Sequence, residues 1–342
     1  MYRGQARERN LTRFIVHIGP HKTGTTYIQE TLSALRDTLL ERGVCVPSIW
    51  NAAPGLPSHL KLVSAIRNRD LTLVREQVQK ILAQRYEYVV ISSEDLSSLS
   101  PHEIVELRKL LDSAATTIAY YVRRWPERLP SKWQEGIKFG RTASFPEYLA
   151  EQLTKYDDSA LRDTPIIDRY ANVFGVNQIK VVSYSTLVDN NLDIARHFLA
   201  AFLNISQIQL PPAVRLNQSL PLVDTELIRA LNSIHARRGC ARSPTLRNWY
   251  LAHKQDLATG VVFGAMRDYM GAILLDERAP SLALESQDLL TRYALSIVPP
   301  RHTDSLHEPR AIDVPFIRPD YLLEPDVPKI LCEIYEMYHQ TL

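Results

Sequence analysis

Cysteine is scarce in this chain, and the spacing of the few cysteines excludes two common uses. Among 342 residues there are only three, Cys45, Cys240 and Cys332, and they lie far apart. An odd number of distant cysteines fits neither a disulfide framework nor the paired spacing of a zinc site. We therefore expect buried or half-buried thiols of a reducing compartment and no metal site. Metal-ligand spacing is also missing among three later histidines, His235, His302 and His307.

Long apolar runs and a strong charge bias are missing too. No run approaches the ~18 apolar residues that a membrane helix needs. Residues 1–10 are polar and rich in arginine, with no apolar segment behind them, so we interpret them as a flexible arm and not as a secretory signal. A net charge of +2 is too small to indicate nucleic acid as the main partner. These absences predict a cytoplasmic protein without an integral membrane segment.

The most informative stretch is an apolar run that leads into a loop and then a helix. Residues 14–18 read Phe-Ile-Val-His-Ile, the pattern of a buried parallel strand, and Gly19 and Pro20 end it. Gly24 has no Cβ, so a ligand can approach the backbone closely there. The helix that follows offers unpaired N–H groups and a partial positive charge at its N-terminus. The stretch is therefore predicted to bind a phosphate group.

The position of the lysine separates this loop from that of the nucleotide hydrolases. Their pattern is Gly, four residues, Gly, Lys and Ser or Thr. Gly19 and Gly24 have that spacing, but Thr25 stands where the lysine belongs, which argues against an ATPase or GTPase. Lys22-Thr23-Gly24-Thr25-Thr26 instead resembles the 5′-phosphosulfate loop of sulfotransferases that use 3′-phosphoadenosine 5′-phosphosulfate (PAPS), usually Lys-Ser/Thr-Gly-Thr-Thr. The resemblance implies that residues His21 to Thr26 bind the 5′ end of PAPS.

A second motif follows a later predicted strand, residues 116–122. The strand ends in Arg123 and Arg124, and Ser131 comes eight residues after Arg123, on the next predicted helix. In the sulfotransferases an Arg and a Ser at this spacing hold the 3′-phosphate, so the resemblance implies this role for Arg123 and Ser131, with Arg124 as a rival. Arginine offers a fixed fork of donors that suits phosphate oxygens. The family's Asn-Pro after the Arg is absent, and Pro126 stands one place late.

Two further stretches resemble parts of the family's PAPS site. Tyr184 begins the sequence Tyr-Ser-Thr-Leu, which matches the first and last residues of the family's Tyr-Glu-Asp-Leu segment, where the Tyr lies near the adenine. The family also has a late basic loop that closes over the 3′-phosphate. Residues 215–219 and the pair Arg238 and Gly239 are both candidates for this loop, and the pair is the nearer match in type.

The proposed chemistry also needs a base, because an acceptor hydroxyl must lose its proton as sulfur is attacked. Ligands of open α/β sheets bind off the carboxyl ends of the strands. The predicted strand 88–91 runs into Ser-Ser-Glu-Asp, so we select Glu94 as the base, with Asp95 and His21 as alternatives. Ser93 or Asp95 could instead cap the next turn, and Glu94 could be a surface or capping carboxylate. Lys22 is placed to neutralise charge that develops on the leaving 5′-phosphate oxygen.

The strand signals together predict an α/β fold. Helical patterns alternate with five predicted strands, at residues 14–18, 43–47, 88–91, 116–122 and 179–184. This alternation predicts a mostly parallel sheet flanked by helices, a three-layer sandwich like that of the P-loop NTPases, and we assign it to residues 11–205 as the PAPS-binding core. Helical patterns and proline clusters dominate beyond, which predicts a helical, loop-rich cap over residues 206–342, packed on the core.

The resemblance implies a sulfotransferase that moves a sulfuryl group from PAPS to an acceptor hydroxyl without a metal. A saccharide, a glycolipid or a small alcohol is a compatible acceptor, and the sequence leaves the acceptor and the oligomeric state open. Two alternatives differ in class. One is a P-loop kinase acting on a small molecule, against which the missing lysine counts. The other is an inactive module that binds PAPS or its desulfated product, 3′-phosphoadenosine 5′-phosphate (PAP).

Overall fold

The computed structural model describes residues 12–111, 115–155, 162–212, 220–298, 306 and 308–341. The predicted arm at 1–10, the candidate loop at 215–219, and His302 and His307 lie outside these residues. The chain forms two compact units whose segments alternate along the sequence. The first unit comprises Met1–Arg123, Asp163–Leu216 and Leu284–Glu308, and the second comprises Arg124–Arg162, Asn217–Ala283 and Pro309–Leu342. The predicted division into a core and a cap near residue 205 stays a prediction.

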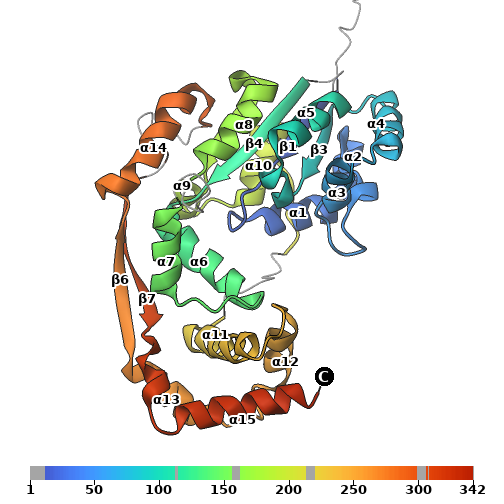
Figure 1. Ribbon diagram of the computed structural model, residues 1–342. Coiled ribbons are helices and arrows are strands. Elements are labelled where there is room, and N and C mark those ends of the chain that lie inside the picture. The colour runs from blue at the N-terminus through green and yellow to red at the C-terminus, as the bar shows by residue number, and fades with distance from the viewer. Residues whose placement is uncertain are drawn as a thin grey trace, which may run out of the picture. The chain divides into compact units, whose positions relative to one another are not determined.

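The first unit is built on a five-stranded sheet with the order β2-β3-β1-β4-β5. Figure 1 labels β1, β3 and β4 of this sheet. Its strands are β1 (Arg13–His17), β2 (Val44–Cys45), β3 (Tyr88–Ser92), β4 (Ala115–Val122) and β5 (Ile179–Ser183). All neighbouring pairs are parallel, and His17 lies opposite Ser92 of β3 and Ala119 of β4. The chain crosses from one side of β1 to the other between β3 and β4, which is where open α/β sheets form their ligand crevice.

Helices cover both faces of this sheet. They are α1 (Thr25–Ala34), α2 (Arg36–Glu41), α3 (Leu60–Asn68), α4 (Thr72–Ala83), α5 (Pro101–Leu110), α8 (Thr164–Phe174), α9 (Tyr184–Asp189), α10 (Ile194–Leu203) and most of α14 (Pro280–Tyr293). Short 3-10 turns are η1 (Ser48–Trp50), η2 (Glu94–Ser98), η3 (Val176–Gln178) and η4 (Ala294–Ser296). Helix α5 begins with a capping box, formed by Ser100 and Glu103 around Pro101.

Alternation along the strands explains the three layers. Phe14 and Val16 belong to a buried cluster with side chains of α3, α4, α5 and α8, whereas Ile15, between them, packs with α1, α2 and α10. Successive side chains of a strand point to opposite faces, so a strand that is buried on both faces must be apolar throughout. The predicted α/β class, with a parallel sheet between two helical layers, is confirmed.

The second unit is mostly helical. Its helices are α6 (Trp125–Lys138), α7 (Phe145–Thr154), α11 (Leu222–Arg237), α12 (Thr245–His253), α13 (Gly260–Asp268) and α15 (Val327–His339), with the 3-10 turn η5 (Pro319–Leu323). They share a core of their own that includes Leu129, Leu231 and Tyr335. The side chain of Arg229 is buried in this unit and forms a bidentate ion pair with Glu226.

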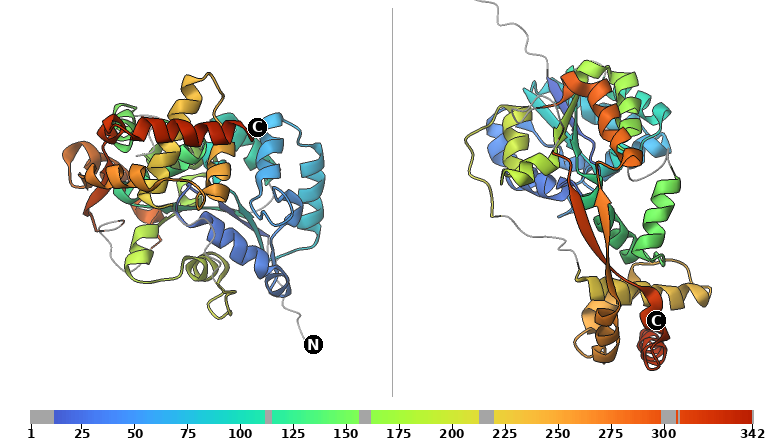
Figure 2. Two further views of the ribbon diagram at one scale, coloured as in Figure 1. Left: turned by 90° about the horizontal axis from the view of Figure 1, so that it is seen from below. Right: turned by 90° about the vertical axis from the view of Figure 1, so that its left-hand side faces the viewer.

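The sequence did not predict one feature of this unit, an antiparallel pair of strands. Strands β6 (Met270–Asp276) and β7 (Ala311–Ile317) form a two-stranded ribbon, drawn in orange and red in Figure 2. Their partners lie about forty positions apart in the chain, and β6 is a continuous apolar run without the alternation of a half-buried strand. Local patterns therefore gave no sign of the pairing.

Two cysteines are more exposed than expected. Cys45 is half-buried on β2, but Cys240, just after α11, and Cys332, on α15, are exposed. The three are free thiols. Across the described ranges, none of the helices combines the length and the apolarity required to cross a lipid bilayer.

Candidate functional site

The loop between β1 and α1 is held in shape by its own hydroxyl groups. Thr23 Oγ1 donates to the carbonyl oxygen of Pro20 at 2.7 Å, and Thr25 Oγ1 donates to the same oxygen at 3.3 Å. Both threonine side chains are buried. Thr26 is exposed in the first turn of α1. We therefore expect Thr23 and Thr25 to support the loop, and Thr26 to present its hydroxyl to a ligand.

Two glycines bring this loop against the ends of other strands. Gly24 precedes α1 with a φ of 77°, and a Cβ there would lie 3.3 Å from Cε2 of Tyr184. Gly19 has a φ of +88°, and a Cβ there would lie 3.0 Å from Cα of Glu94. Both φ values favour glycine, and both approaches leave little room for a side chain. The loop is thereby packed between Tyr184, after β5, and Glu94, after β3.

Arg123 also contacts the loop. Its Nη1 donates to the carbonyl oxygen of Lys22 at 2.9 Å, and its guanidinium lies 5.3 Å from the centre of the Tyr184 ring. Lys22 has a φ of 72°, a backbone conformation that is uncommon for residues other than glycine. The structure thus gathers Lys22, Gly24, Arg123 and Tyr184, four of the residues predicted from the sequence, at one edge of the sheet.

Arg124, the rival of Arg123, is engaged elsewhere. Its side chain is fully buried in the second unit, with Nη1 3.1 Å from Oε1 of Glu127 and Nε 3.7 Å from Oε2 of Glu277. A buried arginine that loses its carboxylate partners leaves an uncompensated charge, so these contacts have a structural role. Arg123, and not Arg124, therefore contacts the loop, and the binding of an anion by either arginine stays a prediction.

Three further residues predicted from the sequence lie in the second unit. Ser131 is partly exposed on α6. Arg238 directly follows α11, and its guanidinium forms an ion pair with Glu336 and lies 4.7 Å from the centre of the Tyr335 ring. Gly239 follows with a φ of 75°. The roles of Ser131, Arg238 and Gly239 in PAPS binding stay predictions.

Glu94 lies where the sequence places the base, in the first position of η2 directly after β3 and Ser93. It is half-buried, and Nε2 of Gln29 donates to its Oε2 at 3.0 Å. Ser93 precedes η2, but its side chain does not cap the turn. Its hydroxyl lies 3.0 Å from the hydroxyl of Ser58. Asp95 and His21, the alternatives for the base, are also half-buried.

Sequence reasoning missed two buried histidines beneath this site. Nδ1 of His17 lies 2.9 Å from Oγ of Ser92, and the backbone N–H of Ser92 donates to Nδ1 of His59 at 3.1 Å. Burial lowers the pKa of each histidine to about 3. The charge of Arg36 also lowers the pKa of His59, against a smaller opposing effect of the Pro47 backbone. Both histidines are therefore neutral supports of the strand ends at neutral pH. A histidine within an apolar strand was the available signal for His17.

These histidines make the stability of the fold depend on pH. The unfolded chain binds their protons near the usual pKa of 6.5, whereas the folded chain binds them only near pH 3. Stability is therefore lost as the pH falls below about 6.5. We expect the free energy of unfolding to drop by about 1.4 kcal/mol for each histidine between pH 7.5 and pH 5.5. Urea titrations at a series of pH values measure this drop.

Substitutions separate this effect from other titrations. Asparagine at position 59 should flatten the dependence on pH by the share of one histidine. The matched control is His102→Asn, because His102 is exposed on α5, and we expect it to leave the dependence unchanged. A wild type whose free energy of unfolding stays constant from pH 7.5 to 5.5 would contradict the assignment.

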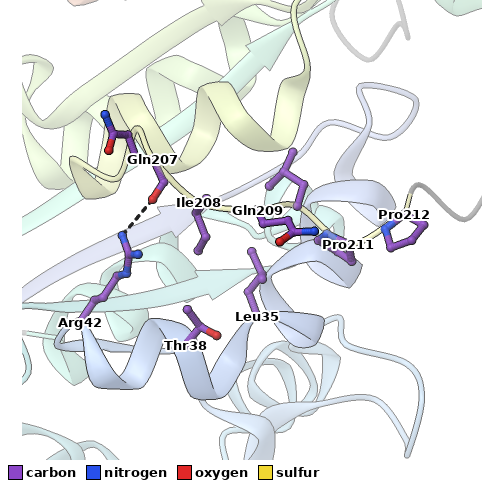
Figure 3. Close-up of a pocket in the computed structure, with 9 residues that line it drawn as sticks. Leu35, Thr38, Arg42, Gln207, Ile208, Gln209, Pro211 and Pro212 are labelled. Carbon is purple, nitrogen blue, oxygen red and sulfur yellow. Dashed lines mark hydrogen bonds between the residues drawn. The ribbon is translucent and has the colours of Figure 1, made fainter.

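A separate hollow lies at the other end of α1 (Figure 3). It has a volume of about 580 Å³, and Nη1 of Arg42 donates to the carbonyl oxygen of Gln207 at 3.2 Å beside it. Its lining residues are Leu35, Thr38, Arg42 and residues 207–212. The site residues predicted from the sequence are not among them. Within the described ranges, His, Cys, Asp and Glu side chains do not gather in threes as a metal site requires.

Comparison with known proteins finds similarity in fold. No protein-family model matches the chain, and no curated protein matches it in sequence. The chain is similar to the crystal structure of a sulfotransferase from Alicyclobacillus acidocaldarius, with 19% sequence identity and a TM-score of 0.38. The similarity covers 69% of this chain and 98% of the other.

Proposed function

We propose that the chain is a sulfotransferase that moves a sulfuryl group from PAPS to an acceptor hydroxyl. The observation that carries the proposal is the meeting of three elements at one edge of the parallel sheet: the loop of Lys22, the guanidinium of Arg123 on the Lys22 carbonyl, and the carboxylate of Glu94. A saccharide, a glycolipid or a small alcohol is the proposed acceptor, and the proposed location is the cytoplasm.

The residues of the loop fit the 5′ end of PAPS. The first N–H groups of α1 have no acceptor within the helix, and the helix dipole favours an anion there. The ammonium of Lys22 and the hydroxyl of Thr26 belong to the same short segment. Together they would hold the phosphosulfate, while Arg123 would bind the 3′-phosphate and the ring of Tyr184 would contact the adenine. PAPS, when bound, supplies a sulfuryl group on a good leaving group.

The protein forms no covalent bond to the substrates in the proposed reaction. The acceptor oxygen forms a bond to sulfur as the bond from sulfur to the bridging phosphate oxygen breaks, and the electron pair stays on that oxygen. Glu94 takes the proton of the acceptor hydroxyl, and Lys22 neutralises the charge on the leaving oxygen. The products are a sulfate ester and PAP. Positioning and charge stabilisation supply most of the rate, as in phosphoryl transfer.

Replacing Arg123 with alanine tests the proposed nucleotide. We expect the affinity for PAP to fall roughly ten- to a hundredfold, because hydrogen bonds to a charged group are among the stronger ones. The affinity for adenosine 5′-phosphate, which lacks the 3′-phosphate, should stay nearly unchanged. Ser131→Ala should act in the same direction. Titration calorimetry with the two nucleotides measures both affinities.

The control for this test is Arg42→Ala, which removes an arginine of the same unit that lines the hollow of Figure 3. It should bind both nucleotides like the wild type. Parallel losses of the two affinities in Arg123→Ala would point to a disturbed loop instead of a lost phosphate contact. Binding of PAP without transfer to any hydroxyl of a broad acceptor screen would favour the inactive binding module.

A further inference from the structure

Gln29 is a polar residue on the buried face of α1. It stands four residues after Thr25, so the two lie on the same side of the helix, and each is only 4% exposed. Ile28 and Leu32, close by on the helix, belong to the apolar core. A buried amide without a partner costs free energy, so its contact is informative.

The partner of this amide is the proposed base. Nε2 of Gln29 donates to Oε2 of Glu94 at 3.0 Å, across the gap between the loop helix and the end of β3. An ionised carboxylate only accepts hydrogen bonds, which explains why the amide presents its nitrogen. The bond engages one carboxylate oxygen and sets the direction of the other.

The backbone of Glu94 is held as well. Its Cα packs against Gly19 of the loop, where a Cβ would come within 3.0 Å. Its carbonyl oxygen accepts a hydrogen bond of 2.7 Å from Oγ of Ser97. With the backbone fixed at two points and the carboxylate at one, the side chain has few orientations left. A base must be held within a fraction of an ångström to act at its full rate.

We propose that Gln29 is a positioning residue that aims Oε1 of Glu94 at the proton of the acceptor hydroxyl. The inference rests on the proposed function, in which Glu94 takes that proton. It also connects two parts of the site, because Gln29 belongs to the helix whose N-terminus would hold the phosphosulfate. A donor bound at that end and the base at η2 are thus placed by one rigid helix.

Replacing Gln29 with methionine, which has a similar length and no donor, tests the proposal. We expect the single-turnover rate of transfer from ³⁵S-labelled PAPS to fall roughly tenfold or more, using the sugar, glycolipid or small alcohol that the wild type sulfates fastest. The affinity for PAP, measured by calorimetry, should stay within about twofold of the wild type. Thr31→Val is the matched control, since Thr31 is buried on the same helix, and it should keep the rate.

A double-mutant cycle distinguishes positioning from a purely structural contact. Adding Gln29→Met to Glu94→Gln should cause almost no further loss of rate, because the group that Gln29 aims is already disabled. The inference would be overturned if the loss of rate in the double variant equalled the product of the two single losses, or if Gln29→Met had the wild-type rate. The single variant Glu94→Gln would still test the base on its own. A wild type that transfers no label overturns both. Gln29→Leu, which also removes the donor and adds no charge beside Glu94, replaces the methionine variant if that variant does not fold.

Discussion

Glutamine at position 94 should lower the single-turnover rate of sulfuryl transfer by roughly 10²–10⁴-fold, the usual range for losing a general base. Glutamine keeps the size of the side chain but cannot accept the proton. Glu94 follows β3 and Ser93, and its Cα packs on the loop at Gly19. The substitution alters only the end of the side chain, so it leaves this packing in place. The affinity for PAPS should therefore be retained.

The rate is measured with enzyme in excess over labelled PAPS, so that product release does not limit it. Asp95→Asn is the matched control, because Asp95 is the adjacent carboxylate and is half-buried like Glu94. We expect it to stay within a few-fold of the wild type. If Glu94→Gln keeps the wild-type rate, the assignment is wrong, and the base must be sought at Asp95 or His21.

Alanine at position 22 is expected to lower the transfer rate by roughly 10²–10³-fold, the range found when one donor to a developing negative charge is removed. The affinity for PAP should fall much less. The charge that Lys22 neutralises grows as the bond to sulfur breaks, so the lysine binds the transition state more strongly than the ground state. An interaction made mainly in the transition state appears in the rate and not in the binding constant.

Calorimetry with PAP and single-turnover assays with PAPS measure the two losses side by side. The control is Lys61→Ala, which removes an exposed lysine of α3 and should change neither quantity. Equal losses in rate and in affinity for PAP would show that Lys22 only binds the nucleotide.

The fold of the first unit was predictable because its strands are mostly apolar. Phe14, Val89 and Ile118 lie in apolar runs, which are typical of strands that are buried on both faces of a sheet. The helices between these strands show regular apolar spacing. The ribbon of β6 and β7 was not predictable, because the partners of Met270–Asp276 come from a distant segment. The two strands are not joined by a short turn, which is the usual sequence signal of an antiparallel pair.

Part of the candidate site could be predicted for a similar reason. Lys22 and Glu94 each follow a recognisable strand. Parallel strands end at the same edge of the sheet, so the sequence predicts that the two residues lie close together. The contact between Gln29 and Glu94 depends on which face of α1 meets η2, and the place of His59 beneath Ser92 depends on how α3 packs. Such contacts are set by tertiary packing, which no local pattern contains.

The most direct test of the central claim is transfer of ³⁵S from labelled PAPS by the wild-type chain, followed by mass spectrometry of the products. The acceptors would be a panel of sugars, glycolipids and small alcohols. We expect a labelled sulfate ester of at least one hydroxyl acceptor, formed together with PAP and without added metal, and we expect Lys22→Ala to lose nearly all of it. A chain that binds PAP but labels none of these acceptors, or one that transfers phosphate from ATP to them instead, would contradict this claim.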